Sequence, residues 1–153
     1  YKQTGIMKAI NEMNVSFFSR SANEGFARAS VAAFAAQLDP TVDELSEIKT
    51  AVSEAVTNCI VHAYRDTIGT IYIKAQIYED GRLVIRVRDK GCGIENTEQA
   101  MEPMFTTGGE ERSGLGFTVM QSFMDRGRVR SCVGRGTTVT LCRRLERRPM
   151  GND

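Results

Sequence analysis

The sequence predicts a single α/β domain, and three observations lead to that fold class. The chain has 153 residues, of which 41% are hydrophobic and 25% charged, as in an ordinary soluble domain. Two segments repeat apolar residues at helical spacing. Several other segments alternate apolar and polar residues, which is the period of a β-strand.

The first third of the chain is expected to form a strand and a helix. Residues 15–20 are a β-like run, and Ser21 with Glu24 has the spacing of a capping box. The helix that starts there is expected to end near Leu38, because the following Asp39 precedes a proline. We therefore expect a strand at 15–20 and a helix at 21–38.

A second, longer helix is expected from Thr41 to about Tyr64. Thr41 and Glu44 repeat the capping spacing. Apolar residues then mark one face of the helix. They are Leu45, Ile48, Val52, Ala55, Cys59 and Ala63.

The remainder alternates between strands and turns. Residues 71–77 and 83–89 show strand periodicity around an Asp-Gly turn, which is typical of a β-hairpin. A long connection rich in Gly, Ser and Thr fills 90–116, and such a segment is usually a functional lid. A helix start is expected at 117–123, followed by a hairpin of strands at 128–133 and 137–145.

Composition argues against several functions. Twenty Lys and Arg against nineteen Asp and Glu give a net charge of +1, which provides no overall field for nucleic acid or an anionic membrane. No apolar run nears the roughly twenty residues of a membrane-spanning helix. Four widely spaced cysteines and one histidine predict no metal centre, and they fit a reducing location. We expect a cytoplasmic protein with no direct nucleic-acid or membrane partner.

Charge is unevenly distributed near the end of the chain. From Asp125 to Arg148 there are eight arginines against two acidic residues. They are scattered over several elements, so a solvated strand face with a frayed tail is the simpler interpretation, and a local basic patch is the alternative.

Glu54 and Asn58 are the first candidates for chemistry. They are four residues apart on the second helix, about 6 Å along its axis, and point the same way. They could be the wet face of an amphipathic helix. However, the surrounding Ala-Val-Thr-Asn-Cys-Ile-Val is apolar nearly all round, so an acid and an amide there need polar partners.

Two glycine-containing motifs are the other candidates. Asp89-x-Gly91-x-Gly93 follows a predicted strand, where a carboxylate can accept hydrogen bonds from an amino group and glycine lets backbone approach a flat ligand. Gly114-x-Gly116 precedes a predicted helix, whose free N–H groups can hold an anion. Taken singly, each motif also fits an ordinary turn.

In this order the three motifs resemble those of the GHKL, or Bergerat-fold, ATPase family. Glu54 and Asn58 correspond to its N box, the Asp89 motif to its G1 box and the Gly114 motif to its G2 box. The resemblance implies a two-layer α/β sandwich, with a mixed, mostly antiparallel sheet, helices on one face and a flexible ATP lid. It covers residues 11–145, leaving tails at 1–10, with Met7 the expected natural start, and at 146–153.

The resemblance also implies site residues and cofactors, namely ATP or ADP with Mg²⁺. Asn58 would hold Mg²⁺, which suits an amide oxygen, and Glu54 would be the general base. Asp89 would accept from the adenine amino group, and Arg112 would neutralise charge on the γ-phosphate. The other nucleotide contacts would be Gly91, Gly93, Thr106, Thr107, Ser113, Gly114, Leu115, Gly116 and Thr137. His62, one turn beyond Asn58, is expected to be structural.

The N-terminal half resembles the anti-sigma serine kinases of that family, through runs such as Ser19-Arg-Ser-Ala-Asn-Glu24 and Gln37-Leu-Asp-Pro-Thr41. This implies an ATP-dependent protein-serine kinase of sporulation that inhibits a sigma factor and phosphorylates a serine of an anti-anti-sigma protein. Glu24 and Arg28 would contact these partners, although they could also form an ordinary helical ion pair. The edge-like strand at 13–19 would pair with its mate in a homodimer.

Two other functions stay open. The predicted lid is short and lacks lysine, so the chain could be a nucleotide-gated sigma-binding module with little or no kinase activity. It could also be the catalytic domain of a sensor histidine kinase. That interpretation is less favoured, because the chain has no room for a dimerising phosphoacceptor helix pair.

Overall fold

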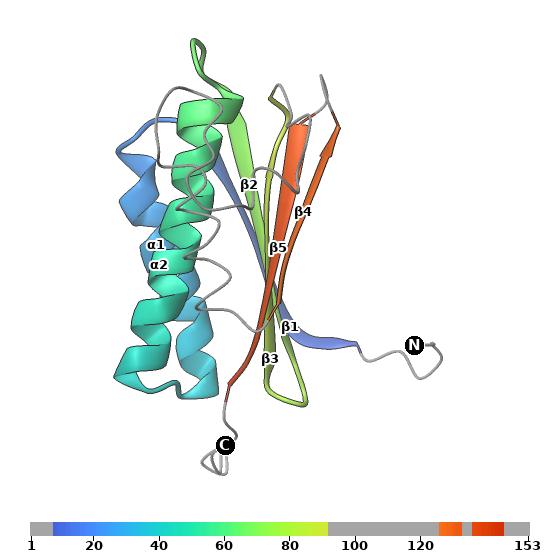
Figure 1. The fold of residues 1–153 in the computed structure, drawn as a ribbon. Coiled ribbons are helices and arrows are strands. Elements are labelled where there is room, and N and C mark those ends of the chain that lie inside the picture. Colours follow the sequence, from blue (N-terminus) through green and yellow to red (C-terminus); the bar gives the residue numbers. More distant parts are fainter. Residues whose placement is uncertain (1–7, 92–125, 133–135, 146–153) are drawn as a thin grey trace.

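The chain folds into two layers, a five-stranded sheet and a pair of helices that cover one of its faces (Figure 1). The computed structural model describes residues 8–91, 126–132 and 136–145, the middle range by its backbone. This confirms the predicted two-layer α/β architecture. The elements are β1 (Ala9–Phe18), α1 (Asn23–Ala35), η1 (Ala36–Leu38), α2 (Val42–Asn58), η2 (Cys59–Ala63), β2 (Thr70–Tyr78), β3 (Arg82–Asp89), β4 (Arg126–Cys132) and β5 (Gly136–Arg144).

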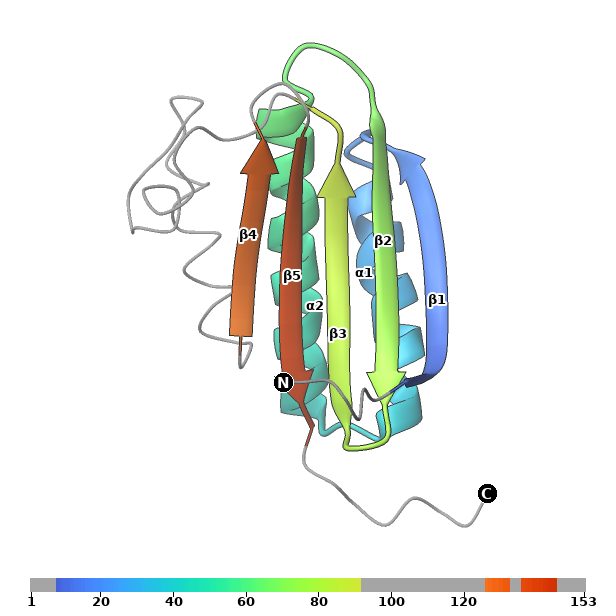
Figure 2. The same cartoon turned by 90° about the vertical axis from the view of Figure 1, so that its right-hand side faces the viewer.

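The strands lie in the order β1-β2-β3-β5-β4 (Figure 2). All four neighbouring pairs within the described ranges are antiparallel, where we expected a mixed sheet. β1 begins at Ala9, six residues before the predicted strand at 15–20, because its pairing with β2 continues to Tyr78 across one register shift. The predicted lid beyond Gly91 and the predicted helix at 117–123 lie outside the described residues.

Strand alternation determines which side chains form the core. In β2, every second residue from Ile71 to Ile77 is buried, and Leu83, Ile85 and Val87 continue the row in β3. Val139 and Leu141 extend it into β5. The helices cover this face of the sheet, which removes its apolar surface from water and stabilises the fold.

The helices present apolar faces to that row. The predicted stripe of the second helix is confirmed, since Ile48, Val52, Ala55 and Cys59 are buried and Leu45 and Ala63 pack against the core. In the described part of the chain, no helix has the length and apolarity that crossing a bilayer requires.

The capping box predicted at the start of α2 is confirmed, and the one predicted at the start of α1 is absent. At α2, Thr41 Oγ1 accepts from the Glu44 backbone N–H at 3.0 Å, and Glu44 Oε1 accepts from the Thr41 N–H at 2.8 Å. At α1 the N-cap is Ala22, with no side-chain cap. There the Glu24 N–H donates to the backbone carbonyl of Ser21, and the Glu24 carboxylate pairs with Arg28 instead.

The second helix changes character at its C-terminal end. We expected an α-helix to about Tyr64, but the α-helical hydrogen bonds end at Asn58 and a π-helical turn, η2, follows. Such turns are rare and occur frequently at functional sites. This one begins immediately after Asn58, the second residue of the predicted helical site.

Candidate functional site

Asp89 is a carboxylate in a position that the strand pattern reserves for apolar residues. It follows Leu83, Ile85 and Val87 on the helix-facing side of β3, and it is 4% exposed. Its cross-strand neighbours are Ile71 and Thr137. The end of β3, the start of β5 and the C-terminal end of α2 lie at the same end of the molecule (Figure 2). Asp89 therefore lies where three elements meet.

Both carboxylate oxygens of Asp89 accept hydrogen bonds from those elements. Oδ1 accepts from the backbone N–H of Gly91 at 2.9 Å and from that of Thr137 at 3.2 Å. Oδ2 accepts from the Cys59 thiol, whose sulfur lies 3.5 Å away. Asp89 thus ties the turn after β3 to both β5 and η2.

The electrostatics of this pair favour a carboxylate that accepts and a thiol that donates. Burial raises the pKa of Asp89, against hydrogen bonds from Gly91, Cys59 and Thr137 that lower it. Burial, and then the charge of Asp89, raise the pKa of Cys59 well above its usual value. Cys59 therefore stays protonated, and the unused lone pairs of Asp89 can accept from another donor.

Two glycines allow the backbone to converge around Asp89. Gly136 has φ 112°, and a Cβ there would overlap the carbonyl oxygen of Asp89. A Cβ on Gly91 would overlap the backbone of Ala63 in η2. Our expectation for Gly91 was close approach to a ligand. In the structure the absent side chain admits the π-helical turn, because the strand end and the helix end pack directly together.

Tyr64 holds the same junction from the other side. Its hydroxyl accepts from the Lys90 N–H at 2.6 Å and donates to the Thr70 carbonyl oxygen at 2.8 Å. Its side chain is buried, and burial is the main reason why its pKa is raised. The ring therefore fixes the residue that follows Asp89 against the start of β2.

Asn58 and Glu54 lie on α2, leading up to this junction. Asn58 is the last α-helical residue and directly precedes Cys59, the partner of Asp89. Its side-chain Nδ2 is buried and has no hydrogen-bond partner among the described residues. Glu54, half-buried and one helical turn earlier, forms no ion pair there either. An orphaned amide and an uncommitted carboxylate are thus adjacent on the helix.

These groups fit a nucleotide with a magnesium ion. A buried N–H donor such as Asn58 Nδ2 costs free energy unless an acceptor satisfies it, and a phosphate oxygen is such an acceptor. Within the described ranges no three His, Cys, Asp or Glu side chains gather as a metal cage. Magnesium needs no such cage, because it keeps several waters and takes one or two protein oxygens together with phosphates. Asn58 would hold the ion, and Asp89 would accept from the base.

The structure brings some of the predicted site together and does not reach the rest. Asp89, Gly91 and Thr137 converge through hydrogen bonds to the Asp89 carboxylate, and Asn58 directly precedes Cys59, which donates to the same carboxylate. His62 is buried in η2, and its structural role stays a prediction. The other predicted contacts lie outside the described residues. They are Gly93, Thr106, Thr107, Arg112, Ser113, Gly114, Leu115 and Gly116.

Three residues of the junction were not predicted from the sequence as site residues. The sequence pattern places Cys59 in the apolar stripe of the second helix, Tyr64 at the end of that helix and Gly136 in a hairpin turn. A usable signal existed for Cys59, because an acid in the apolar phase of a strand requires a buried donor nearby. Tyr64 and Gly136 carry no such signal, since their contacts depend on where β3 ends relative to η2 and β5.

Glu24 and Arg28 lie on α1, away from Asp89. Arg28 Nη1 is 2.8 Å from Glu24 Oε2, the helical ion pair considered as the simpler interpretation, and 3.3 Å from Ser53 Oγ of α2. Beside them Phe26 is 50% exposed, and its ring meets that of Phe17 of β1 edge-on, with the two centroids 5.9 Å apart. A large apolar side chain and an ion pair thus share an accessible surface at the start of α1.

Comparison with known proteins places this fold in a class. The family model described as "Histidine kinase-like ATPase domain" matches residues 19–143. The histidine kinase domain of the Erythrobacter litoralis EL346 blue-light activated histidine kinase superimposes with a TM-score of 0.56 at 20% identity, covering 80% of this chain and 61% of that one. That similarity concerns the fold alone. The fold is therefore that of a histidine kinase-like ATPase domain, a class that implies nucleotide binding.

More similar sequences define the family within that class. The anti-sigma F factor of Caldanaerobacter subterraneus subsp. tengcongensis is 56% identical over 142 residues, which are 92% of this chain and 99% of that protein. The anti-sigma F factor of Geobacillus stearothermophilus is 57% identical over 132 residues, 86% of this chain and 90% of that protein. The chain therefore belongs to the anti-sigma F factor family.

Proposed function

We propose that this protein is a cytoplasmic anti-sigma factor of sporulation that binds and inhibits a sigma factor. With Mg²⁺ and ATP, it would also phosphorylate a serine of an anti-anti-sigma protein. Its membership in the anti-sigma F factor family supports the first activity. The observation that carries the second is the buried Asp89 carboxylate joined through Cys59 to the end of the Glu54 and Asn58 helix.

Asp89 would select the nucleotide base. Its Oδ1 is already held by two backbone N–H groups, and Oδ2 receives a long contact from a thiol, which is a weak donor. A purine amino group is a better donor for such a carboxylate than a thiol. Thr137, fixed opposite Asp89 in β5, would complete the base contacts together with Gly93.

Asn58 and Glu54 would serve the phosphate end. Bound Mg-ATP supplies the phosphoryl group to be transferred. The Asn58 amide oxygen would contribute a metal ligand. Its buried Nδ2, which has no partner among the described residues, would donate to a phosphate oxygen. Glu54, one turn away, would accept the proton of the incoming serine hydroxyl as general base. Arg112 would neutralise phosphate charge.

The start of α1 would receive the protein partners. Exposed Phe26 offers apolar contact area, and the ion pair of Glu24 with Arg28 offers charges of both signs. β1 borders the sheet and pairs with β2 alone within the described strands. Its outer edge would pair with the β1 edge of a second copy in a homodimer.

A phosphotransfer assay with a matched variant tests the kinase proposal. The protein is incubated with labelled Mg-ATP and a serine-containing anti-anti-sigma protein. Transfer is followed in wild type, Glu54→Gln and Asp43→Asn, which removes the same charge at the other end of α2. We expect Glu54→Gln to slow transfer by about 10²–10⁴-fold while nucleotide binding is retained, and Asp43→Asn to behave as wild type.

Each other result has a defined meaning. If wild type captures a sigma factor in a nucleotide-dependent manner but transfers nothing, the chain is a nucleotide-gated binding module. If Glu54→Gln transfers as fast as wild type, Glu54 is not the base. If wild type binds neither ADP nor ATP by calorimetry, the Asp89 site is not a nucleotide pocket.

A further inference from the structure

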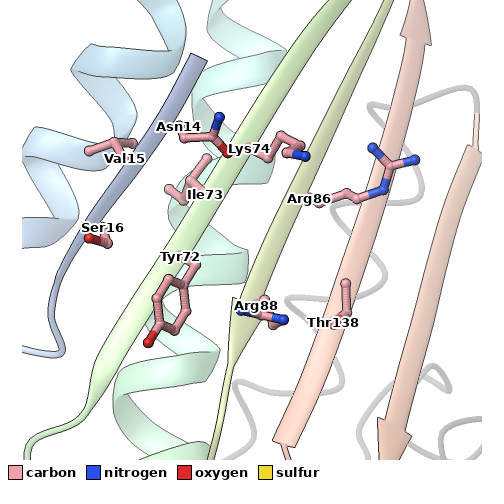
Figure 3. A pocket seen from close by; sticks show the side chains of 9 residues that line it. All are labelled: Asn14, Val15, Ser16, Tyr72, Ile73, Lys74, Arg86, Arg88 and Thr138. Carbon is pink, nitrogen blue, oxygen red and sulfur yellow. The ribbon is translucent and has the colours of Figure 1, made fainter. Parts of the chain in front are cut away.

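In the described part of the chain, the sheet face turned away from the helices carries mainly positive charge. Lys74 of β2 and Arg86 and Arg88 of β3 lie on this face, and we call these three residues the basic face (Figure 3). A chain of net charge +1 therefore concentrates positive charge on one surface.

The basic face borders a hollow of about 470 Å³ on the open side of the sheet. Asn14 and Ser16 of β1, Tyr72 of β2 and Thr138 of β5 also line it. Figure 3 shows these polar side chains in adjacent strands, with Tyr72, Arg88 and Thr138 in one row across the sheet. Neutral donors thus lie among the cations, as a surface that binds carboxylates requires.

Two cross-strand pairs of like charge differ in whether a carboxylate bridges them. Arg82 and Arg144 face each other across β3 and β5, and Asp80 Oδ2 lies 3.0 Å from one and 3.1 Å from the other. Lys74 and Arg86 face each other across β2 and β3 in the same way. Among the described residues no carboxylate forms an ion pair with either one. Like charges directly opposite are destabilising, so the second pair is maintained at a cost.

The acidic residue nearest to this pair is already engaged. Within the described strands Glu12 is the one acid on the open face between β1 and β3, and it accepts hydrogen bonds from Gln76 at 2.8 Å and Asn14 at 3.2 Å. Those bonds are the main reason why the pKa of Glu12 is lowered, and the charge of Lys74 contributes less. Arg86 in turn donates to Gln76 Oε1 at 2.8 Å.

Arg88 is held against the ring of Tyr72, and two cations cover that ring. Arg88 lies 4.9 Å and Lys90 5.2 Å from the Tyr72 ring centroid. The ring is therefore occupied by cations, whereas a surface for single-stranded nucleic acid presents open rings on which bases stack. The restrained guanidinium groups suit carboxylates, which they can bind in a bidentate manner.

We infer that the basic face docks an acidic segment of another protein, whose carboxylates fill the hollow and supply the missing partner between Lys74 and Arg86. Charge complementarity selects the occupant, because the described side chains of this face offer cations and neutral donors but no uncommitted acid. The surface is independent of the proposed kinase chemistry, since these side chains lie on the sheet face opposite to Asp89 and the helices.

A labelled peptide of ten glutamates is the probe, with a ten-residue glutamine peptide as its uncharged counterpart. Fluorescence anisotropy is measured at low and at 0.5 M salt with wild type, K74Q/R86Q and R20Q/K49Q. The last variant removes the same charge from residues outside this face. We expect the glutamate peptide to bind wild type, to release at high salt and to bind K74Q/R86Q about tenfold more weakly. The R20Q/K49Q variant should bind as wild type does.

Amide chemical shifts and ADP titration complete the test. Peptide-induced shifts are expected on β2, β3 and β5 around residues 72–74, 86–88 and 138, and both variants should bind ADP as wild type does. Equal weakening in both variants would overturn the inference by showing a bulk charge effect, as would failure of the peptide to bind wild type. Tighter binding of a ten-nucleotide oligo-dT through the same residues would identify a nucleic-acid surface instead. Dissociation of a dimer by K74Q/R86Q in sedimentation would identify a second copy as the occupant.

Discussion

The two faces of the sheet follow one alternation but differ in what they contribute. The face under the helices carries an apolar row from Ile71 to Leu141, and it accounts for the stability of the domain. The open face carries Lys74, Arg86 and Arg88, which contribute no core. Asp89 lies at the end of the apolar row, in its phase. The buried carboxylate on the stabilising face and the mainly positive surface on the other are therefore two places where the sequence departs from what folding needs.

The sharpest way to break this arrangement is Gly136→Ala. Gly136 has φ 112°, and an added Cβ would overlap the carbonyl oxygen of Asp89, so β5 would have to move away from β3. We expect the free energy of unfolding, measured by urea denaturation, to fall by about 2–4 kcal/mol.

Gly25→Ala is its matched control. Gly25 lies in α1, where the nearest atom to an added Cβ is Arg28 Nη2 at 3.6 Å. Alanine there should leave the free energy of unfolding unchanged or raise it by up to about 1 kcal/mol. Equal loss in both variants would show that the contact with Asp89 is not the cause.

Asp89→Asn tests the polar residue itself. The amide oxygen can still accept from Gly91 and Thr137, but the group that faces Cys59 can no longer accept. We expect nucleotide affinity, measured by calorimetry, to fall by roughly 10-fold to 150-fold, the value of one hydrogen bond to a charged group. Unchanged affinity would show that Asp89 has only a structural role.

The pH dependence of the same variant shows whether Asp89 is buried as an anion. Its folded-state pKa is raised above 3.8 by burial, so the ionised carboxylate disfavours folding. Its contribution to stability is greatest below pH 3.8 and is lost as pH rises through the folded-state pKa. The free energy of unfolding of wild type relative to Asp89→Asn should therefore fall over that interval. A difference that rises with pH would mean that the hydrogen bonds outweigh burial.

The fold was largely predictable because alternation and helical stripes report burial directly. The row from Ile71 to Val87 and the stripe from Ile48 to Cys59 both appear in the structure. The capping box at Thr41 was predictable too, because it depends on residues three apart. The same spacing at Ser21 failed, since Arg28 competes for the Glu24 carboxylate.

The motifs of the proposed site could be found in the sequence, but the contacts that join its chain segments could not be predicted. Asp89 and Asn58 follow from residue type and position. The π-helical turn, the contact of Cys59 with Asp89 and the Tyr64 bridge between Lys90 and Thr70 depend on how three chain segments meet. The periodicity of a local sequence does not show which distant segments come into contact. The close contact of Gly91 with η2 could not be predicted for the same reason, and its contact with a nucleotide stays a prediction.

Lys74→Gln gives the smallest effect and tests the open face by its sign. Because Lys74 faces Arg86 without a bridging carboxylate in the described residues, removing its charge should raise the free energy of unfolding by about 0.2–0.5 kcal/mol at low salt. Asp80→Asn, which removes the carboxylate shared by Arg82 and Arg144, should lower it. Both differences should shrink in 0.5 M salt, since charges at the surface are screened. If Lys74→Gln destabilised the protein instead, the pair would be stabilising within the chain, and the open face would have no need of an acidic partner to offset it.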